Sequence, residues 1–258
     1  MLVPCRLELP EVHVRPQSVE IKVTVAGDQV GPAISALALA GGNRWSILFC
    51  EDVADGAAST PLLDLGVILR ARRKSENKGD STVKLRPCRW SQLDPEHFAN
   101  SDDGVTELKI EADWAGSGRH LTASMTADWP GHRWAEVQAG DAPPADLFSK
   151  PQQEFLERCS GGRINLVALT ALPSFTATRW EAFPTTVDGV NLSVRAERWT
   201  VDGAGDYLEL SIVSTVERGE ADQAALHSFV AAKGLSADDS PRNKTERVLA
   251  ALVARVAA

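Results

Sequence analysis

The chain has 258 residues, a formal net charge of −8 at pH 7 and 43% hydrophobic residues. This length is sufficient for one domain with a sizeable core. The acidic balance argues against general affinity for double-stranded nucleic acid or for an anionic membrane, because nonspecific binding to either depends on a basic surface. Any anion site must therefore be a local concentration of Lys and Arg inside an acidic protein.

Several other classes of protein are disfavoured by what the sequence lacks. No run approaches the roughly 20 apolar residues of a membrane-spanning helix, and the first residues lack the charged-then-apolar order of a signal peptide. The 4 cysteines have no paired spacing, and the 5 histidines are scattered without ligand spacing, so neither a disulfide framework nor a zinc site is indicated. A reducing, cytoplasmic location is the simplest expectation.

The first predicted element is a strand that follows an N-terminal extension. Residues 1–17 form this extension, in which residues 6–14 are expected to add one edge strand. From residue 18 the sequence alternates strictly, with Glu20 and Lys22 on one side and Val19 and Ile21 on the other. Such alternation is typical of a strand that buries one face and exposes the other to polar surroundings.

Later segments repeat the alternation with charged residues on one side. These charged or polar residues are Arg70, Arg72, Lys74, Thr82, Lys84, Arg86, Glu107, Lys109, Glu111, Asp113, Glu209 and Ser211. For any single segment, a solvated sheet face is the simplest interpretation. However, cations cluster between residues 70 and 86, whereas carboxylates lie nearer both ends of the chain. A closed or nearly closed sheet would bring both kinds of charge around one lumen.

Helices punctuate these strands, and turn signals favour antiparallel hairpins. Helices are predicted at residues 29–40, 149–159, 221–233 and from residue 240 onward. Strands of the second half are predicted at residues 166–172, 174–183, 191–201 and 207–215. The last helix carries an apolar stripe that includes Leu249 and Leu252. We expect this stripe to pack against the exterior of the sheet, with a homodimer contact as the alternative.

Four motifs occur in an order that resembles one family. They are Glu20-x-Lys22, the run Ile47-Leu-Phe-Cys-Glu-Asp52, the pattern Leu62-x-x-x-Gly-Val-x-Leu-Arg-x-Arg72 and Val83-Lys-Leu85, and they are followed by late strands that carry Glu197 and Glu209. This order resembles the CYTH or triphosphate tunnel metalloenzyme superfamily, from about residue 18 to about residue 249. The resemblance implies a single domain that is mainly β with peripheral α-helices, built on an eight-stranded antiparallel tunnel-like β-barrel.

The resemblance also implies a site and a chemistry. Its members act on triphosphate-containing or polyphosphate compounds with Mg²⁺ or Mn²⁺. The implied phosphate-binding residues are Arg70, Arg72, Lys84, Arg86, Arg179 and Lys244. The implied metal ligands are Glu20, Glu197 and Glu209, and the implied catalytic residues are Lys22 and Glu20. Two further carboxylates, Glu107 and Glu111, either complete the metal shell or neutralise the cations.

The sequence departs from the family pattern at two carboxylates. The family opens with Glu-x-Glu-x-Lys, where this chain has Ser18 in place of the first Glu, and its late Glu-x-Glu is here Glu209-Leu-Ser211. If both serines face neighbouring positions in the lumen, they deplete one metal site. The expected function is a metal-dependent phosphohydrolase. The alternatives are a degenerate protein that binds or senses a phosphate-rich ligand, and a nucleotide cyclase.

Tryptophans offer a further candidate feature. Of the 7 tryptophans, Trp90 and Trp134 fall in irregular stretches, where they are candidates for stacking on the organic part of a ligand. Trp45, Trp180 and Trp199 fall in predicted strands, where packing is the expected role.

Overall fold

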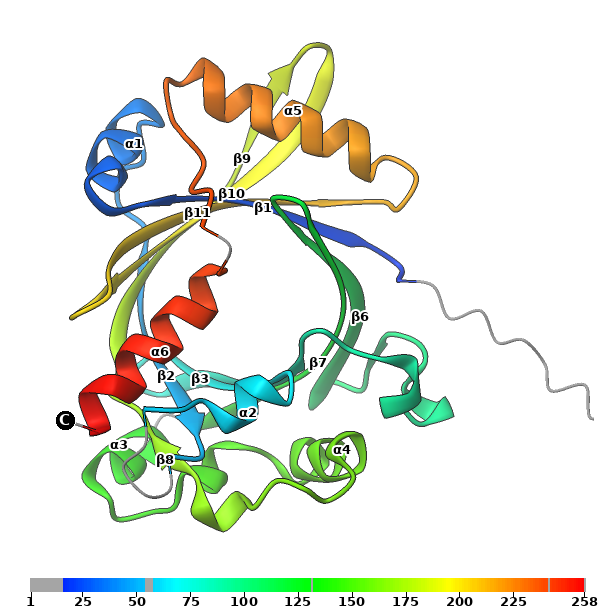
Figure 1. Ribbon diagram of the computed structural model, residues 1–258, viewed down its shortest axis with the longest axis vertical. Helices are drawn as coiled ribbons and strands as arrows, with labels where there is room; N and C mark the ends of the chain where they lie inside the picture. The colour runs from blue at the N-terminus through cyan, green and yellow to red at the C-terminus, as the bar shows by residue number, and fades with distance from the viewer. Residues whose placement is uncertain (1–15, 54–57, 131, 241, 258) are drawn as a thin grey trace, which may run out of the picture.

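Alternating apolar side chains bring most of the chain into one large β-sheet with helices on its flanks (Figure 1). The computed structural model describes residues 16–53, 58–130, 132–240 and 242–257. The expected N-terminal edge strand at residues 6–14 lies outside the described residues.

The strands lie close to the segments expected from the alternation. They are β1 (Val19–Ala26), β2 (Asn43–Glu51), β3 (Val67–Ser75), β4 (Lys78–Leu85), β5 (Ser101–Asp102), β6 (Thr106–Ala115), β7 (Gly118–Pro130), β8 (Thr170–Ala171), β9 (Phe175–Val187), β10 (Val190–Val201) and β11 (Gly205–Ser214). The segment 166–172, expected to be one strand, instead begins with a 3-10 helix (Leu166–Ala168) and contributes only the short β8.

Helices connect the strands and cover them. They are α1 (Val30–Ala36), α2 (Pro61–Asp64), α3 (His132–Ala139), α4 (Lys150–Ser160), α5 (Gly219–Ala232) and α6 (Lys244–Ala257). The expected N-cap at Ser149 is confirmed, because its hydroxyl accepts a hydrogen bond from the Gln152 backbone N–H. None of the helices in the described ranges is both long and apolar enough to cross a membrane.

The sheet closes on itself into a ring. Its 11 strands follow the order β1-β11-β10-β9-β2-β3-β4-β7-β6-β5, with β8 on β2, and β6 also pairs with β1. The closing pair is parallel, whereas the others are antiparallel. The expected closed and mainly antiparallel sheet is therefore confirmed. The expected count of eight strands and the uniformly antiparallel pairing are wrong, because the sheet has 11 strands, of which β5 and β8 are two residues long, and its two ends meet in parallel.

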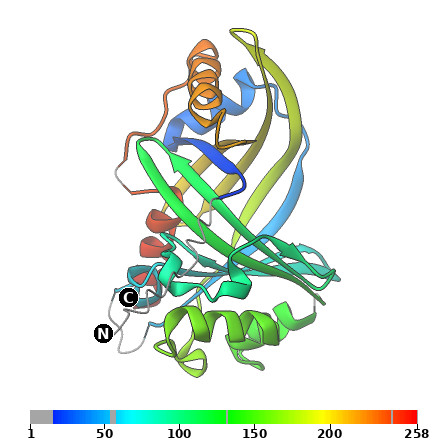
Figure 2. The same ribbon diagram turned by 90° about the vertical axis from the view of Figure 1, so that its right-hand side faces the viewer.

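The outer face of the ring is apolar and is covered by two groups of helices. Val19 and Ile21 of β1 are fully buried against α1 and α5, in a cluster that includes Phe229. On the opposite flank, the outer faces of β3, β4 and β7 pack on α3 and α4 through residues such as Trp134 and Phe155. Figures 1 and 2 show the two groups of helices at opposite ends of the molecule. The outer face therefore supplies most of the core, which leaves the inner face free to carry charge.

The C-terminal helix α6 takes a different position from the one expected. Its Leu249 and Leu252 are buried in a cluster with Phe49, Phe175 and Trp199, which lie on the inner face of β2, β9 and β10. The expectation that α6 packs on the exterior is therefore wrong, because one part of the inner face is apolar and needs a cover. This packing brings the first residue of α6 into the ring.

Candidate functional site

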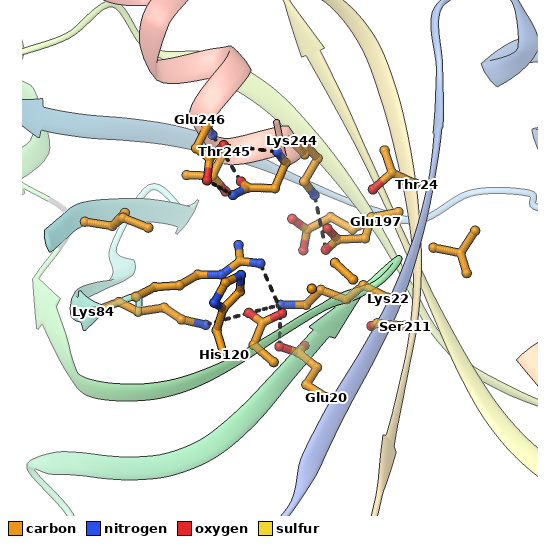
Figure 3. Close-up of a pocket in the computed structure, with 18 of the residues that line it drawn as sticks. Glu20, Lys22, Thr24, Lys84, His120, Glu197, Ser211, Lys244, Thr245 and Glu246 are labelled. Carbon is orange, nitrogen blue, oxygen red and sulfur yellow. Dashed lines mark hydrogen bonds and ion pairs between the residues drawn. The ribbon is translucent and has the colours of Figure 1, made fainter. Parts of the chain in front are cut away.

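The ring encloses a cavity of about 840 Å³, here called the lumen, whose lining is dominated by charged side chains (Figure 3). Every residue that the family resemblance implies for the site lines it. These residues are Glu20, Lys22, Arg70, Arg72, Lys84, Arg86, Arg179, Glu197, Glu209 and Lys244, and Glu107 and Glu111 line it as well. The structure thus brings together residues from seven strands, one helix and the residue after β4, Arg86, while their individual roles stay predictions.

A buried carboxylate, Asp113, organises one side of the lumen. Its side chain is 0% exposed, and its oxygens lie 2.9 Å from Lys22 Nζ and 3.4 Å from both Lys84 Nζ and Arg86 Nη2. Lys22 also lies 2.6 Å from Glu20. We call these five residues the Asp113 cluster. The sequence placed Asp113 on the charged side of a strand but gave it no role, because the parallel pairing of β6 with β1 was not foreseen.

The charge states in this cluster follow from burial and from mutual attraction. Burial alone would raise the pKa of Asp113, but Lys22, Lys84 and Arg86 outweigh burial and hold that pKa well below its usual value. Burial would likewise lower the pKa of Lys22, yet Asp113 and Glu20 raise it. The Lys22–Asp113 pair is therefore fully ionised near neutral pH.

The pKa values of Lys84, a member of the cluster, and of the adjacent Glu111 are shifted in the opposite sense. Burial and the charge of Glu20 raise the pKa of Glu111. Burial and the like charge of Lys22 lower the pKa of Lys84. Both shifts oppose ionisation, because burial penalises the charged form of each group.

Three lumen-lining arginines, from β3, β9 and β10, make no ion pair with any described residue. Arg70 reaches only the Thr82 hydroxyl, at 3.4 Å, and its buried Nε has no hydrogen-bond partner. Arg179 contacts the ring of Trp45, at 5.2 Å from the ring centroid, and the Arg195 side chain forms no ion pair or hydrogen bond with any described residue. We call Arg70, Arg179 and Arg195 the open wall. Burial and nearby Arg72 lower the pKa of Arg70 to about 10, which still leaves it charged at neutral pH.

Arg72 is adjacent to the open wall but is not part of it. Its Nε and Nη2 atoms lie 2.7 and 2.8 Å from the two oxygens of Asp80, which Lys74 also contacts at 2.6 Å. Its guanidinium lies 5.3 Å from the centroid of the Trp45 ring, which Arg179 approaches from the neighbouring strand. Trp45 therefore holds two guanidinium groups by cation–π contact. The sequence assigned Trp45 to packing and missed this contact.

Two further carboxylates face each other across β10 and β11. Glu197 and Glu209 are paired in the strand register. Lys244, at the start of α6, places Nζ 3.3 Å from Glu209 and 3.8 Å from the centroid of the Trp199 ring. Burial would raise the pKa of Glu197, but Lys244 and Arg70 outweigh it and lower that pKa. Figure 3 shows Glu197 and Lys244 pointing into the same part of the lumen.

The lumen carboxylates differ in their fit to a divalent cation. Among the described residues, the one group of three His, Cys, Asp or Glu residues with ligand atoms within 4.8 Å of one another is Asp94, Glu96 and His97, which lies outside the lumen. Glu20 is held by Lys22 and does not join Glu197 and Glu209. The Glu197–Glu209 pair nevertheless fits Mg²⁺, which proteins commonly bind through one or two carboxylates together with substrate phosphates.

The two serines that replace family carboxylates do not share one site. Ser211 lies opposite Lys22 in the β1–β11 register, and Ser18 is four residues earlier in the chain, about 13 Å along the strand. The expectation that Ser18 and Ser211 are neighbours is therefore wrong, because the antiparallel register separates them.

Other sequence candidates are placed away from the lumen. Trp90 packs edge-on against Phe98, Trp134 is buried and stacked on Trp129, and neither lines the lumen, so neither can stack on a ligand bound there. Conversely, His120 and His227 line the lumen. Sequence reasoning missed these histidines because they have no ligand spacing.

Together, the fold and the site define a closed, mainly antiparallel sheet around a lumen that carries both cations and carboxylates. No known family matches the sequence, and no curated protein is detectably similar to it in sequence. Solved structures do resemble the fold. HpAC1 from Hippeastrum, a proposed adenylyl cyclase described as having a dominant triphosphatase activity, is 17% identical with a TM-score of 0.53, over 92% of this chain and 94% of its own.

A second solved structure agrees with the first. A proposed adenylate cyclase from Bacillus halodurans is 14% identical with a TM-score of 0.55, over 90% of this chain and 97% of its own. At such low identity the likeness shows the fold alone. The chain therefore has the fold of these proteins, and the tunnel-like fold expected from the CYTH resemblance is confirmed.

Proposed function

We propose that this protein is a metal-dependent phosphohydrolase whose substrate is a triphosphate-containing or polyphosphate compound bound in the lumen. The observation that carries the proposal is the open wall together with the Glu197–Glu209 pair inside one cavity. Guanidinium groups are well suited to phosphate oxygens, because their N–H groups form charge-assisted and often bidentate hydrogen bonds. A carboxylate pair beside them is suited to Mg²⁺ or Mn²⁺.

In the proposed mechanism, the cations of the lumen hold and orient the phosphate chain. Arg70 and Arg179 have guanidinium groups free to bind phosphate oxygens, and Arg72, Lys84 and Arg86 add positive potential from within their ion pairs. Glu197 and Glu209 would hold the cation, which when bound supplies a Lewis acid that polarises phosphate oxygens and an attacking water. Lys22 keeps its proton and offsets negative charge on the phosphate chain, which is the main catalytic demand of phosphoryl transfer.

A second candidate function has an observation in its favour. Glu20 is paired with Lys22 and Glu209 with Lys244, so each metal ligand that the family resemblance implies at these positions already has a cationic partner. This pairing favours a protein that binds or senses a phosphate-rich ligand without turnover. A nucleotide cyclase has less support, because Phe49 and Trp199, which line the lumen, are buried and offer no open ring to a base.

One experiment tests these functions together. Phosphate release and thermal stabilisation would be measured on one panel of triphosphates, with Mg²⁺ and with Mn²⁺, for the wild type and for Arg70→Gln. Release that depends on metal and falls in Arg70→Gln supports the hydrolase. Stabilisation without release supports the binding protein, and neither response on any triphosphate would refute both. Arg44→Gln is the matched control, because Arg44 is exposed and lies outside the lumen.

A further inference from the structure

Strand register places three polar side chains in one row across the inner face of the ring. Lys22 of β1 lies opposite Ser211 of β11, and Ser211 lies opposite Arg195 of β10. Paired residues on neighbouring strands have Cα atoms about 4.5 to 5.5 Å apart, so these side chains are immediate neighbours. Figure 3 shows Ser211 beside Lys22 in the lumen.

This row differs in charge from the next row along the same strands. Glu197 and Glu209 are two residues away on β10 and β11, about 6.5 to 7 Å along the strand axis. That next row offers two carboxylates. The row of Lys22, Ser211 and Arg195 offers two cations and a neutral hydroxyl, and no carboxylate. A hydroxyl flanked by cations favours an anion over Mg²⁺, since Mg²⁺ is held mainly by carboxylates and phosphates.

Two members of the row are available to a ligand. The Ser211 hydroxyl makes no hydrogen bond with any described residue. The Arg195 side chain makes no ion pair, hydrogen bond or aromatic contact with any described residue. Both side chains line the lumen. The register between β9 and β10 shifts between Val194 and Ala196, so Arg195 has no regular partner on β9. Such irregularities redirect side chains and occur frequently next to active sites. Lys22 is held by Glu20 and Asp113 and adds positive potential.

We propose that Ser211 and Arg195 form a phosphoryl-binding subsite beside the Glu197–Glu209 pair, at a position where the family pattern has a carboxylate. The ligand class is a chain of phosphoryl groups, one of which is bound by the Arg195 guanidinium and the Ser211 hydroxyl. This inference rests on the proposed function and deepens it. Under this proposal Ser211 binds an anion, and its role is more than the absence of a metal-binding carboxylate.

The test is calorimetric binding of inorganic triphosphate at fixed salt and fixed Mg²⁺. Arg195→Gln is expected to weaken binding about tenfold, because one charge-assisted contact is lost. Arg195→Lys should recover part of the affinity, since it restores the charge but not the planar fork. Ser211→Glu should weaken binding by at least about tenfold by placing a carboxylate against the phosphoryl group, whereas Ser211→Ala should cost about two- to threefold.

Controls separate this subsite from the fold and from the proposed function. Arg44→Gln is the matched arginine control, and thermal unfolding checks that each variant is folded. If Arg70→Gln weakens binding while Arg195→Gln or Ser211→Glu leaves it unchanged, the subsite is refuted and the proposed function stands. If the wild type binds no triphosphate, the proposed function fails and this inference fails with it. Loss in both variants with recovery in Arg195→Lys supports the subsite.

Discussion

The two sides of the lumen carry similar side chains in different electrostatic states. In the Asp113 cluster, Lys22, Lys84 and Arg86 all surround one buried carboxylate. In the open wall, Arg70 and its neighbours have no carboxylate partner among the described residues. The same residue types therefore stabilise the closed ring on one side and remain available to a ligand on the other. The difference lies in which strand is adjacent, because the carboxylate of the cluster comes from β6.

The largest expected effect concerns the stability supplied by the Asp113 cluster. Asp113→Asn should lower the free energy of unfolding by about 3 to 5 kcal/mol, because it leaves buried cations without their charge partner. Urea unfolding at pH 7 measures this effect. Asp128→Asn is the matched control, because Asp128 is 88% exposed, and it should change stability by less than about 0.5 kcal/mol. Equal stability of Asp113→Asn and the wild type would contradict the organising role of Asp113.

The next effect contrasts one arginine from each side. Arg70→Gln should weaken triphosphate binding by about tenfold or more, since a charge-assisted hydrogen bond contributes about 1.5 to 3 kcal/mol, and should change the unfolding free energy little. Arg86→Gln should lower the unfolding free energy and weaken triphosphate binding less than Arg70→Gln does, because Arg86 is paired with Asp113 and adds only positive potential to the lumen. Calorimetric binding and urea unfolding on both variants measure the contrast. Equal losses of affinity would show that the two sides do not differ.

Arg72 requires a separate expectation. Arg72→Ala should weaken phosphate binding by about tenfold, but it should also destabilise the fold, because it leaves the buried Asp80 with Lys74 as its remaining ion-pair partner. Arg70 is therefore the cleaner probe of ligand binding.

Acid unfolding should report on the Asp113 cluster through the pKa of its carboxyl. Asp113 has a lowered pKa in the folded protein, so below its ordinary pKa of about 3.9 the unfolded chain binds more protons. Its contribution to stability is thus present above about pH 4 and is lost as the pH falls, by at most about 1.4 kcal/mol per pH unit. Between pH 6 and pH 3, the free energy of unfolding measured in urea should fall less steeply in Asp113→Asn than in the wild type.

Glu111 supplies the control of opposite sign. Its pKa is raised in the folded protein, so protonation of Glu111 stabilises the folded state as the pH falls. The unfolding free energy of Glu111→Gln should therefore fall more steeply with decreasing pH than that of the wild type. Shifts of the same sign in Asp113→Asn and Glu111→Gln would be inconsistent with the assigned pKa directions.

The smallest expected effect tests how the open wall is held in place. Trp45→Leu removes the ring that contacts Arg72 and Arg179. Cation–π contacts at partly exposed sites contribute about 0.5 to 1 kcal/mol, so triphosphate affinity should fall by about two- to fivefold. Trp90→Leu, outside the lumen, is the matched control and should leave affinity unchanged. If triphosphate affinity falls in Trp90→Leu but not in Trp45→Leu, Trp45 does not position the open wall.

Much of the fold and the site was predictable from local pattern. The alternation around Glu20 and Lys22 identified both the strand and its charged face, because successive side chains of a strand point to opposite sides. Ser149 identified a helix start through its capping chemistry. The arginines at 70 and 72 were placed correctly in the lumen for the same reason of periodicity.

Only the tertiary structure decided which strands and side chains meet. A two-residue period fixes which residues share a face, but it does not identify the neighbouring strand or the register. Asp113 therefore gained its role only when β6 met β1, and Ser18 and Ser211 were separated by the register between β1 and β11. The stripe of α6 determined that this helix would be buried. Its burial on the inner face depended on the apolar patch formed by strands distant in the sequence, including Phe49 and Trp199.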